Sequence, residues 1–106
     1  MSTAFAPMSS PRAREVKTLS GEELRRAFLI GNVILESRIK MTFTDLDRMA
    51  LGGVKPTAGP VTLDNDRETG ADFFLARREL GVINVGGPGK INVDGKSFSL
   101  ANLDCL

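Results

Sequence analysis

The strongest constraint on the fold lies in the last third of the chain, where short apolar segments alternate with compact turn sequences. Residues 81–85, 90–93 and 96–100 each have the length and apolar content of a short strand. The turns between them are Gly86–Gly89 and Asp94-Gly95, and an Asp-Gly pair strongly favours a hairpin because its turn needs positive φ at both residues. We therefore expect consecutive antiparallel strands over residues 72–100, the first of them at 72–77.

One short helix is predicted near the N-terminus. Ser20 and Glu23 match the capping-box pattern, in which each side chain accepts a hydrogen bond from the backbone N–H of the other residue. Leu24, Ala27 and Phe28 then lie at the spacing of one helical face. Gly31-Asn32 supplies residue types that end a helix.

The middle of the chain reads as strands and loops. Residues 33–43 alternate between apolar and polar side chains, interrupted only at Ile34 and Ser37, and predict a half-buried strand. Shorter apolar pieces at 49–51 and 61–63 are candidate strands between Gly- and Pro-rich turns, and a loop is expected over 64–70.

These segments predict an all-β domain, an antiparallel β-sandwich or jelly roll with one short N-terminal helix. A length of 106 residues suits one domain. We expect residues 1–17 to be a flexible segment and residues 18–106 to form the domain. The last residues resemble the start of a further strand that would leave an open sheet edge, so we expect a truncated domain.

Composition excludes several function classes. Fourteen Lys and Arg residues against thirteen Asp and Glu residues leave a net charge of +1, which gives no basic excess for nucleic acid or an anionic membrane. No apolar run is long enough to span a bilayer, and the first residues lack the pattern of a signal peptide. One cysteine, Cys105, cannot form an intramolecular disulfide, and a cytoplasmic location is the simplest reading.

Candidate reactive groups are few. A catalytic Cys105 is disfavoured because the chain has no histidine to activate the thiol. The same absence removes nitrogen ligands for a metal, and Asp45, Asp47, Asp72 and Glu79 have no spacing that indicates a carboxylate site. Asp64, Asp66 and Glu68 alternate, but Thr69 and Leu75 stand where a calcium loop needs glycine and glutamate, so a solvated turn is favoured.

Two further sequences permit a binding role without favouring it. Gly86–Gly89 could be read as a phosphate-binding loop, but a strand-like segment follows instead of a helix, which favours a hairpin turn. The Arg77-Arg78-Glu79 cluster could bind a carboxylate substrate by bidentate hydrogen bonds. A solvated or interface charge group is the favoured interpretation of that cluster.

A longer string is far more specific than any of these motifs. Residues 73–87, FFLARRELGVINVGG, closely resemble the 5-dehydro-4-deoxy-D-glucuronate isomerases, also called 4-deoxy-L-threo-5-hexosulose-uronate ketol-isomerases, of pectin and uronate breakdown. The resemblance extends over most of residues 18–104. It includes the next hairpin at 90–95, the loop with Asp47-Arg48, Gly52-Gly53 and Pro56, and the N-terminal helix. Asp45 stands where family members have a histidine.

This resemblance implies a cupin-like fold and an aldose–ketose-type isomerisation of 5-dehydro-4-deoxy-D-glucuronate to 3-deoxy-D-glycero-2,5-hexodiulosonate. It also implies a hexameric enzyme with a zinc ion held by three histidines and a glutamate in its second half. The chain resembles only the first half, so we assign it no catalytic, substrate-binding or metal-binding residue. The chain alone is expected to be inactive and to bind no zinc. In the whole enzyme it is expected to serve as scaffold and assembly surface.

The alternative is a stand-alone small β-domain that binds a sugar or a protein partner without catalysis. The absence of Trp and Tyr weighs against this alternative, because these residues commonly stack on sugars and anchor interfaces.

Overall fold

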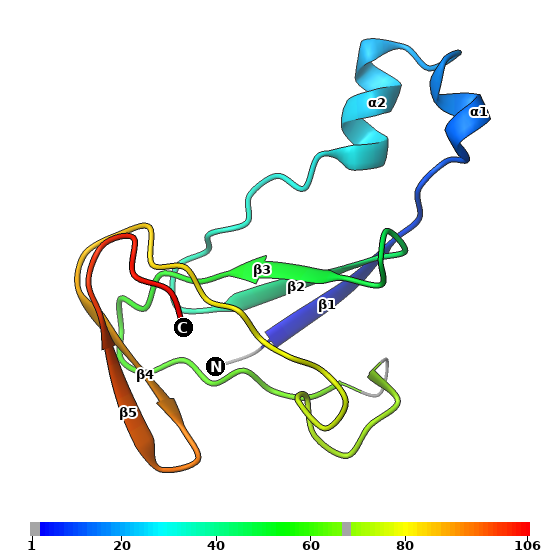
Figure 1. Ribbon diagram of the computed structural model, residues 1–106. Coiled ribbons are helices and arrows are strands. Elements are labelled where there is room, and N and C mark those ends of the chain that lie inside the picture. Colours follow the sequence, from blue (N-terminus) through cyan, green and yellow to red (C-terminus); the bar gives the residue numbers. More distant parts are fainter. Residues whose placement is uncertain (1–2, 67–68) are drawn as a thin grey trace. The chain divides into compact units, whose positions relative to one another are not determined.

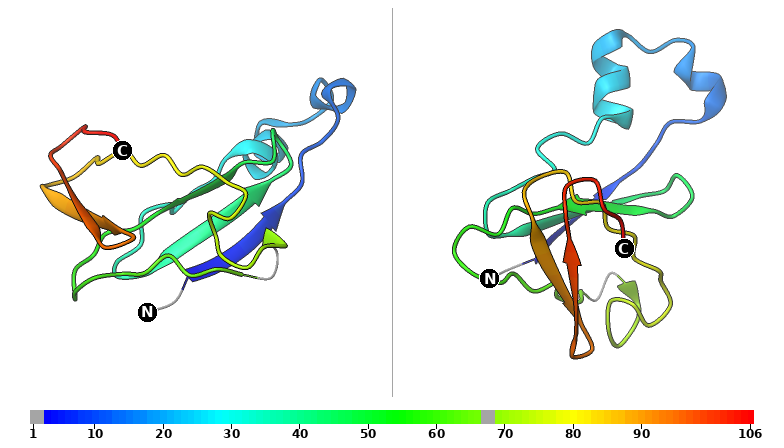
Figure 2. Two further views of the ribbon diagram at one scale, coloured as in Figure 1. Left: turned by 60° about the horizontal axis from the view of Figure 1, so that its bottom comes forward. Right: turned by 60° about the vertical axis from the view of Figure 1, so that its left-hand side comes forward.

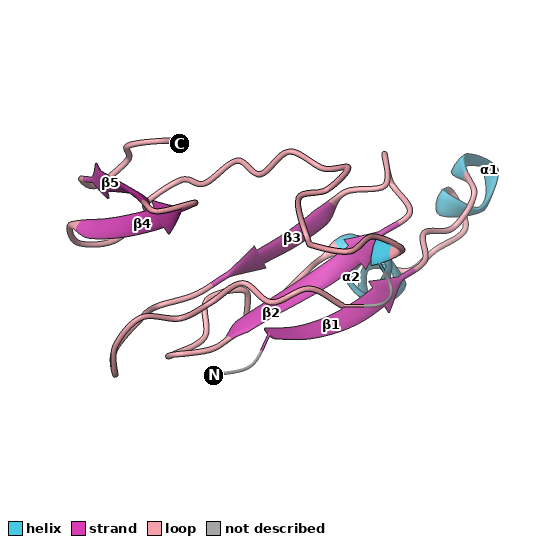
Figure 3. Cartoon of the chain, turned by 90° about the horizontal axis from the view of Figure 1, so that it is seen from below, coloured by secondary structure: helices cyan, strands magenta, loops and turns pink. Residues whose placement is uncertain are grey.

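The computed structural model describes residues 3–66 and 69–106, and these residues divide into two compact units, the first ending at Phe74 and the second spanning Leu75–Leu106. The first unit contains strand β1 (Thr3–Met8), helices α1 (Ala13–Val16) and α2 (Gly21–Phe28), and strands β2 (Ile39–Thr44) and β3 (Ala50–Gly53). The second contains strands β4 (Gly89–Val93) and β5 (Lys96–Leu100). Figure 3 shows these strands separated by long loops.

The predicted N-terminal helix is α2, and its capping box is confirmed. The Ser20 backbone N–H donates to Glu23 Oε2 at 2.8 Å, and the Glu23 N–H donates to Ser20 Oγ at 3.2 Å. The helix ends at Phe28, three residues before the predicted Gly31. A second helix, the single turn α1, was not predicted.

Three strands form the sheet of the first unit, in the order β1-β2-β3 (Figure 1). Strand β2 pairs antiparallel with β3 but parallel with β1, so the expectation of purely antiparallel pairing is wrong for β1. Within the segment predicted to be flexible lie β1 and α1. Apolar side chains explain this pairing: the Phe5 ring of β1 stacks on Phe43 of β2, with centroids 5.4 Å apart.

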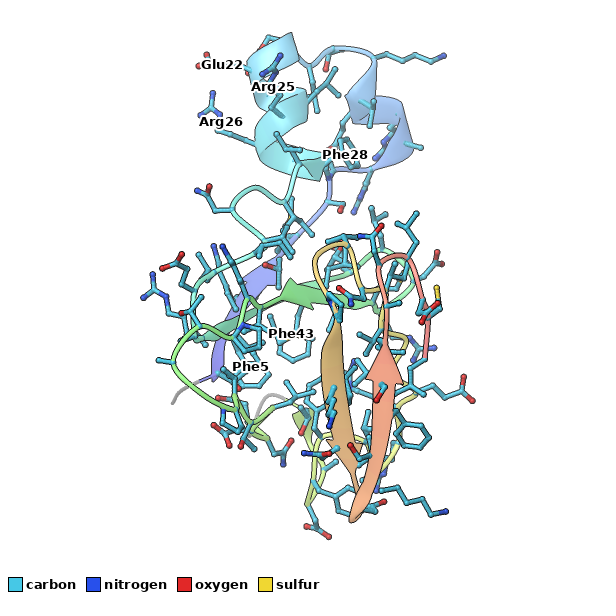
Figure 4. The ribbon with its side chains drawn as sticks, turned by 90° about the vertical axis from the view of Figure 1, so that its left-hand side faces the viewer. Phe5, Glu22, Arg25, Arg26, Phe28 and Phe43 are labelled. Carbon is cyan, nitrogen blue, oxygen red and sulfur yellow. The ribbon has the colours of Figure 1, made fainter. Side chains whose placement is uncertain are left out.

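The core of this unit lies on the Phe5 side of the sheet. Phe74 contacts Phe5 with ring centroids 6.3 Å apart, and the labelled Phe5 and Phe43 rings lie together in Figure 4. Ile39, Met41 and Phe74 are the buried apolar residues of the unit. Burial of aromatic and aliphatic side chains at this position fixes β1 and β2 against each other.

The strand predicted over 33–43 begins only at Ile39. Ser37 has φ of 52°, a left-handed conformation that interrupts an extended segment, and before it only Glu36 forms an isolated bridge, with Lys55. The Ser37 hydroxyl instead accepts hydrogen bonds from the backbone N–H groups of Thr57 and Ala58. The candidate strand at 49–51 is confirmed as β3, shifted to start at Ala50, whereas residues 61–63 form no strand.

The second unit confirms the predicted hairpin. Strands β4 and β5 pair antiparallel around Asp94-Gly95, whose φ values of 48° and 78° are both positive as the turn requires (Figure 2). The other two predicted strands are wrong as strands: residues 72–77 form bends and turns, and in 81–85 only Ile83 makes a β-bridge, with Cys105. The partner of 81–85 is therefore the C-terminal segment.

The described elements confirm the all-β class, since sheets rather than helices organise both units. A cupin-like jelly roll and a domain boundary at residue 18 stay predictions. Within residues 3–66 and 69–106, no helix has the length and apolar content to cross a bilayer.

Candidate functional site

The carboxylates considered for metal binding do not come together. Among the residues that the structure describes, no three His, Cys, Asp or Glu side chains are grouped closely enough to hold a metal ion. Zinc in the part of the family that this chain does not match stays a prediction.

Asp45 has a structural contact instead. Both of its carboxylate oxygens lie within hydrogen-bond distance of the Ser10 backbone N–H, at 3.0 and 3.1 Å, and its own N–H donates to the Met8 carbonyl at 3.3 Å. These contacts tie the exit of β1 to the end of β2. The Ser10 hydroxyl beside them is buried without a hydrogen-bond partner. The Asp45 side chain therefore holds the backbone that follows β1 in place.

Hydrogen bonds organise the described part of the acidic loop, and the Asp64 N–H also donates to the Thr3 hydroxyl of β1 at 3.0 Å. Asn65 donates to the Ala71 carbonyl at 2.8 Å, and the Thr69 hydroxyl lies 2.8 Å from both Asn65 Oδ1 and the Asp66 carbonyl. These hydrogen bonds organise the segment as a turn. Glu68, the third acidic residue of the motif, lies outside the described residues.

The Gly86–Gly89 segment leads into strand β4, but residues 81–85 pair with the C-terminal segment and not with β4, so the predicted hairpin at Gly86–Gly89 is wrong. Asn84 organises the segment: the side-chain Nδ2 donates to the Gly87 and Leu100 carbonyls at 2.9 and 3.0 Å, and Oδ1 accepts from the Gly86 N–H at 3.0 Å. Because a strand follows this segment, it offers no helix N-terminus to a phosphate.

Arg77 and Glu79 are exposed and Arg78 is half-buried, all in an irregular stretch. Cys105 is exposed, and its thiol has the carbonyl of Leu103 as a weak acceptor at 3.8 Å. With no histidine in the chain, nothing in its surroundings supplies the base that a catalytic thiol needs.

Sequence reasoning missed a groove between helix α2 and the turn that joins β2 to β3. Its volume is about 160 Å³, and Phe28 lines it from the side of α2 away from Arg26 (Figure 4). The lining residues come from β1, α2, β2, β3 and the loops between them: Met8, Ala27, Phe28, Ile30, Thr44, Leu46, Asp47, Met49 and Leu51. Only the apolar spacing of α2 hinted at it.

The chemistry of this groove does not suit a uronate. Thr44 and Asp47 are its only polar side chains, and the Asp47 carboxylate would repel the carboxylate of a sugar acid. A polyhydroxylated anion also needs many hydrogen-bond donors when it leaves water. The groove therefore suits apolar side chains better than a sugar acid.

Comparison with known proteins supplies what the geometry lacks. No family model matches the chain. A protein of Opitutus terrae is 51% identical over 98 residues, which are 92% of this chain and 36% of the relative. Relatives from Pectobacterium carotovorum and Formosa agariphila are each 40% identical, over 92% and 100% of this chain and 36% and 38% of their own lengths.

All three relatives carry the name of a uronate ketol-isomerase. The chain is therefore homologous to proteins of the sugar-acid isomerase class. The particular family is the 4-deoxy-L-threo-5-hexosulose-uronate ketol-isomerases, the one that residues 73–87 indicated, and that resemblance is confirmed. The chain spans about a third of the length of these relatives, consistent with their N-terminal part.

Proposed function

We propose that this chain supplies the N-terminal, non-catalytic part of a 4-deoxy-L-threo-5-hexosulose-uronate ketol-isomerase. The observation that carries the proposal is the identity of 40–51% with three relatives of that name over at least 92% of this chain. The described residues bring no three candidate metal ligands together, which supports a proposal that puts the chemistry in the part of the relatives that this chain does not match.

In this proposal the chain acts as scaffold in a cytoplasmic homo-oligomeric enzyme that converts the uronate substrate to its ketol isomer. Moving a proton between adjacent carbons needs a base and an electrophile that stabilises the enediolate. A zinc ion held by the other part of the protein would supply that electrophile when bound. The residues of this chain would position that part and exclude water from it, without touching the reacting atoms.

The test compares two proteins: this chain alone, and an extended protein that joins it to the C-terminal residues of the Opitutus terrae relative outside the alignment. Each is titrated with zinc by calorimetry and assayed for isomerisation of the uronate. We expect zinc binding and turnover from the extended protein only. Tight zinc binding by the chain alone would overturn the proposal, and an inactive but folded extended protein would favour a stand-alone β-domain.

A further inference from the structure

The second unit contains a short antiparallel pairing between residues 81–85 and 103–106, which we name the terminal ladder. Val82 and Leu106 exchange two backbone hydrogen bonds, each 2.9 Å long, and the Asn84 N–H donates to the Asp104 carbonyl at 3.0 Å. Between them Ile83 lies opposite Cys105 in a β-bridge. The ladder is thus a defined structure, not a loose end of the chain.

One face of the terminal ladder is apolar and exposed. Residues directly opposite each other in an antiparallel pair have side chains on the same face, and alternate residues of a strand share that face. Ile83, Val85 and Cys105 therefore lie together, and we name them the Ile83 face. Ile83 and Val85 are each 64% exposed, whereas Val82 and Asn84 on the opposite face are half-buried.

An exposed surface of this composition is unfavourable in water. β-branched side chains stabilise a sheet when neighbours pack on them. Each large aliphatic side chain that stays in water loses the about 1.5–3 kcal/mol of stabilisation that burial would give. The Ile83 face contains no charged residue. Its preferred occupant is therefore an apolar polypeptide segment and not a polar ligand.

We infer that the Ile83 face is the docking surface for the part of the isomerase polypeptide that this chain does not match, an inference that rests on the proposed function. The matched 98 residues are 36% of the Opitutus terrae relative, so most of that protein must pack elsewhere. Residues that follow position 106 in a longer protein leave from the ladder itself. An apolar segment close in sequence reaches this face with the lowest entropy of closure.

Cys105 makes the inference testable because its thiol belongs to the Ile83 face. The rate of its alkylation by iodoacetamide is measured by peptide mass spectrometry in this chain and in the extended protein defined above. We expect rapid reaction in the chain alone. In the extended protein the reaction slows by about tenfold or more, since the thiol then reacts only after local opening.

Two variants of the extended protein locate the effect. Ile83→Asp places a charge in the docked face, and we expect Cys105 to regain most of its reactivity. Leu29→Asp is the matched control, because Leu29 is 63% exposed and lies in the first unit, away from the ladder in sequence. It should leave the protection of Cys105 unchanged. Circular dichroism of both variants checks that each one folds.

The outcomes separate this inference from the proposed function. An active extended protein whose Cys105 reacts as fast as in the chain alone would overturn the inference and leave the proposed function standing. Protection of Cys105 in an inactive extended protein would support the docking surface and count against the function. Equal effects of Ile83→Asp and Leu29→Asp on the alkylation rate of Cys105 would also overturn the inference.

Discussion

Polar side chains with several backbone partners hold the irregular segments of both units in place. The Ser37 hydroxyl accepts from two N–H groups at 3.0 Å and lies 2.8 Å from the Thr57 hydroxyl, which joins residues 55–58 to the approach of β2. Asn84 does the same in the second unit. Loops need such partners because their backbone groups have no ladder to satisfy them. Single side chains therefore decide whether these segments stay ordered.

Asn84→Ala removes three side-chain hydrogen bonds from the turn before β4. We expect a loss of about 2–3 kcal/mol in the local stability of the second unit, since each such bond contributes about 0.5–1.5 kcal/mol. Hydrogen exchange of the β4 and β5 amides measures it. Asn92→Ala, at an exposed position of β4, is the control. It should change the opening free energy obtained from hydrogen exchange by less than about 0.5 kcal/mol. Equal effects would contradict the role of Asn84.

Gly52 of β3 is required by its close approach to β2. A Cβ at this position would lie 2.7 Å from the Lys40 carbonyl oxygen, a backbone atom that cannot move away without disturbing the ladder. We predict that Gly52→Ala destabilises the first unit by about 1–3 kcal/mol in urea unfolding. Gly31→Ala, where no atom lies within 4 Å, is the control and should be neutral or stabilising. A neutral Gly52→Ala would refute this packing.

At the scale of elements, the two hairpins show how local sequence and conformation agree or conflict. The β4–β5 turn has Asp94-Gly95, which takes positive φ at low cost. The β2–β3 turn has Asp47 and Arg48, both with φ of 52°, closed by a hydrogen bond from the Met49 N–H to the Leu46 carbonyl. A residue with a Cβ atom costs about 1–2 kcal/mol in the left-handed region of positive φ. The β2–β3 turn therefore stores strain.

Arg48→Gly should therefore stabilise the first unit by about 0.5–1 kcal/mol, because glycine accepts φ of 52° without a steric penalty. An increase in the urea midpoint without a change in slope is the expected result. The reverse substitution in the other hairpin, Gly95→Ala at φ of 78°, should destabilise β4–β5 by a similar amount. A lower midpoint for Arg48→Gly would show that the arginine side chain stabilises the turn.

Elements governed by neighbouring residues could be predicted from the sequence. The Ser20 cap, helix α2 and the Asp94-Gly95 hairpin depend on residues within a few positions of each other. Strand β1 could not, because it is stabilised by pairing with β2 across a long stretch of chain and by the stacking of Phe5 on Phe43. The strand over 33–38 failed because Ser37 takes a left-handed conformation to bond with Thr57 and Ala58, which alternation does not reveal.

At the scale of the whole molecule, many large apolar side chains are exposed in both units. Besides the Ile83 face they include Leu29, Phe73 and Leu103, each more than 60% exposed. Large apolar side chains left in water favour association, because contact between copies removes them from water. We predict that the isolated chain self-associates at micromolar concentrations, with sedimentation showing species heavier than the 11.4 kDa monomer. A clean monomer that unfolds cooperatively would contradict this prediction.

Little of the candidate site could be predicted from residue types. The absence of histidine excluded nitrogen ligands, and the resemblance of residues 73–87 gave the family. The groove at α2 and the Ile83 face depend on which apolar side chains stay uncovered after folding, and periodicity does not distinguish these from the core. Ile83 and Val85 look like core residues in the sequence, yet each is 64% exposed.

The central claim is that this chain is a non-catalytic part of a uronate ketol-isomerase. The most direct measurement is kcat/KM for the isomerisation of 4-deoxy-L-threo-5-hexosulose uronate, with zinc present, by the chain alone, by the extended protein and by the intact Opitutus terrae relative. We predict that the extended protein approaches the relative and that the chain alone shows no turnover above the uncatalysed rate. Comparable turnover by the chain alone would contradict the account, because the catalytic groups would then lie among its own residues.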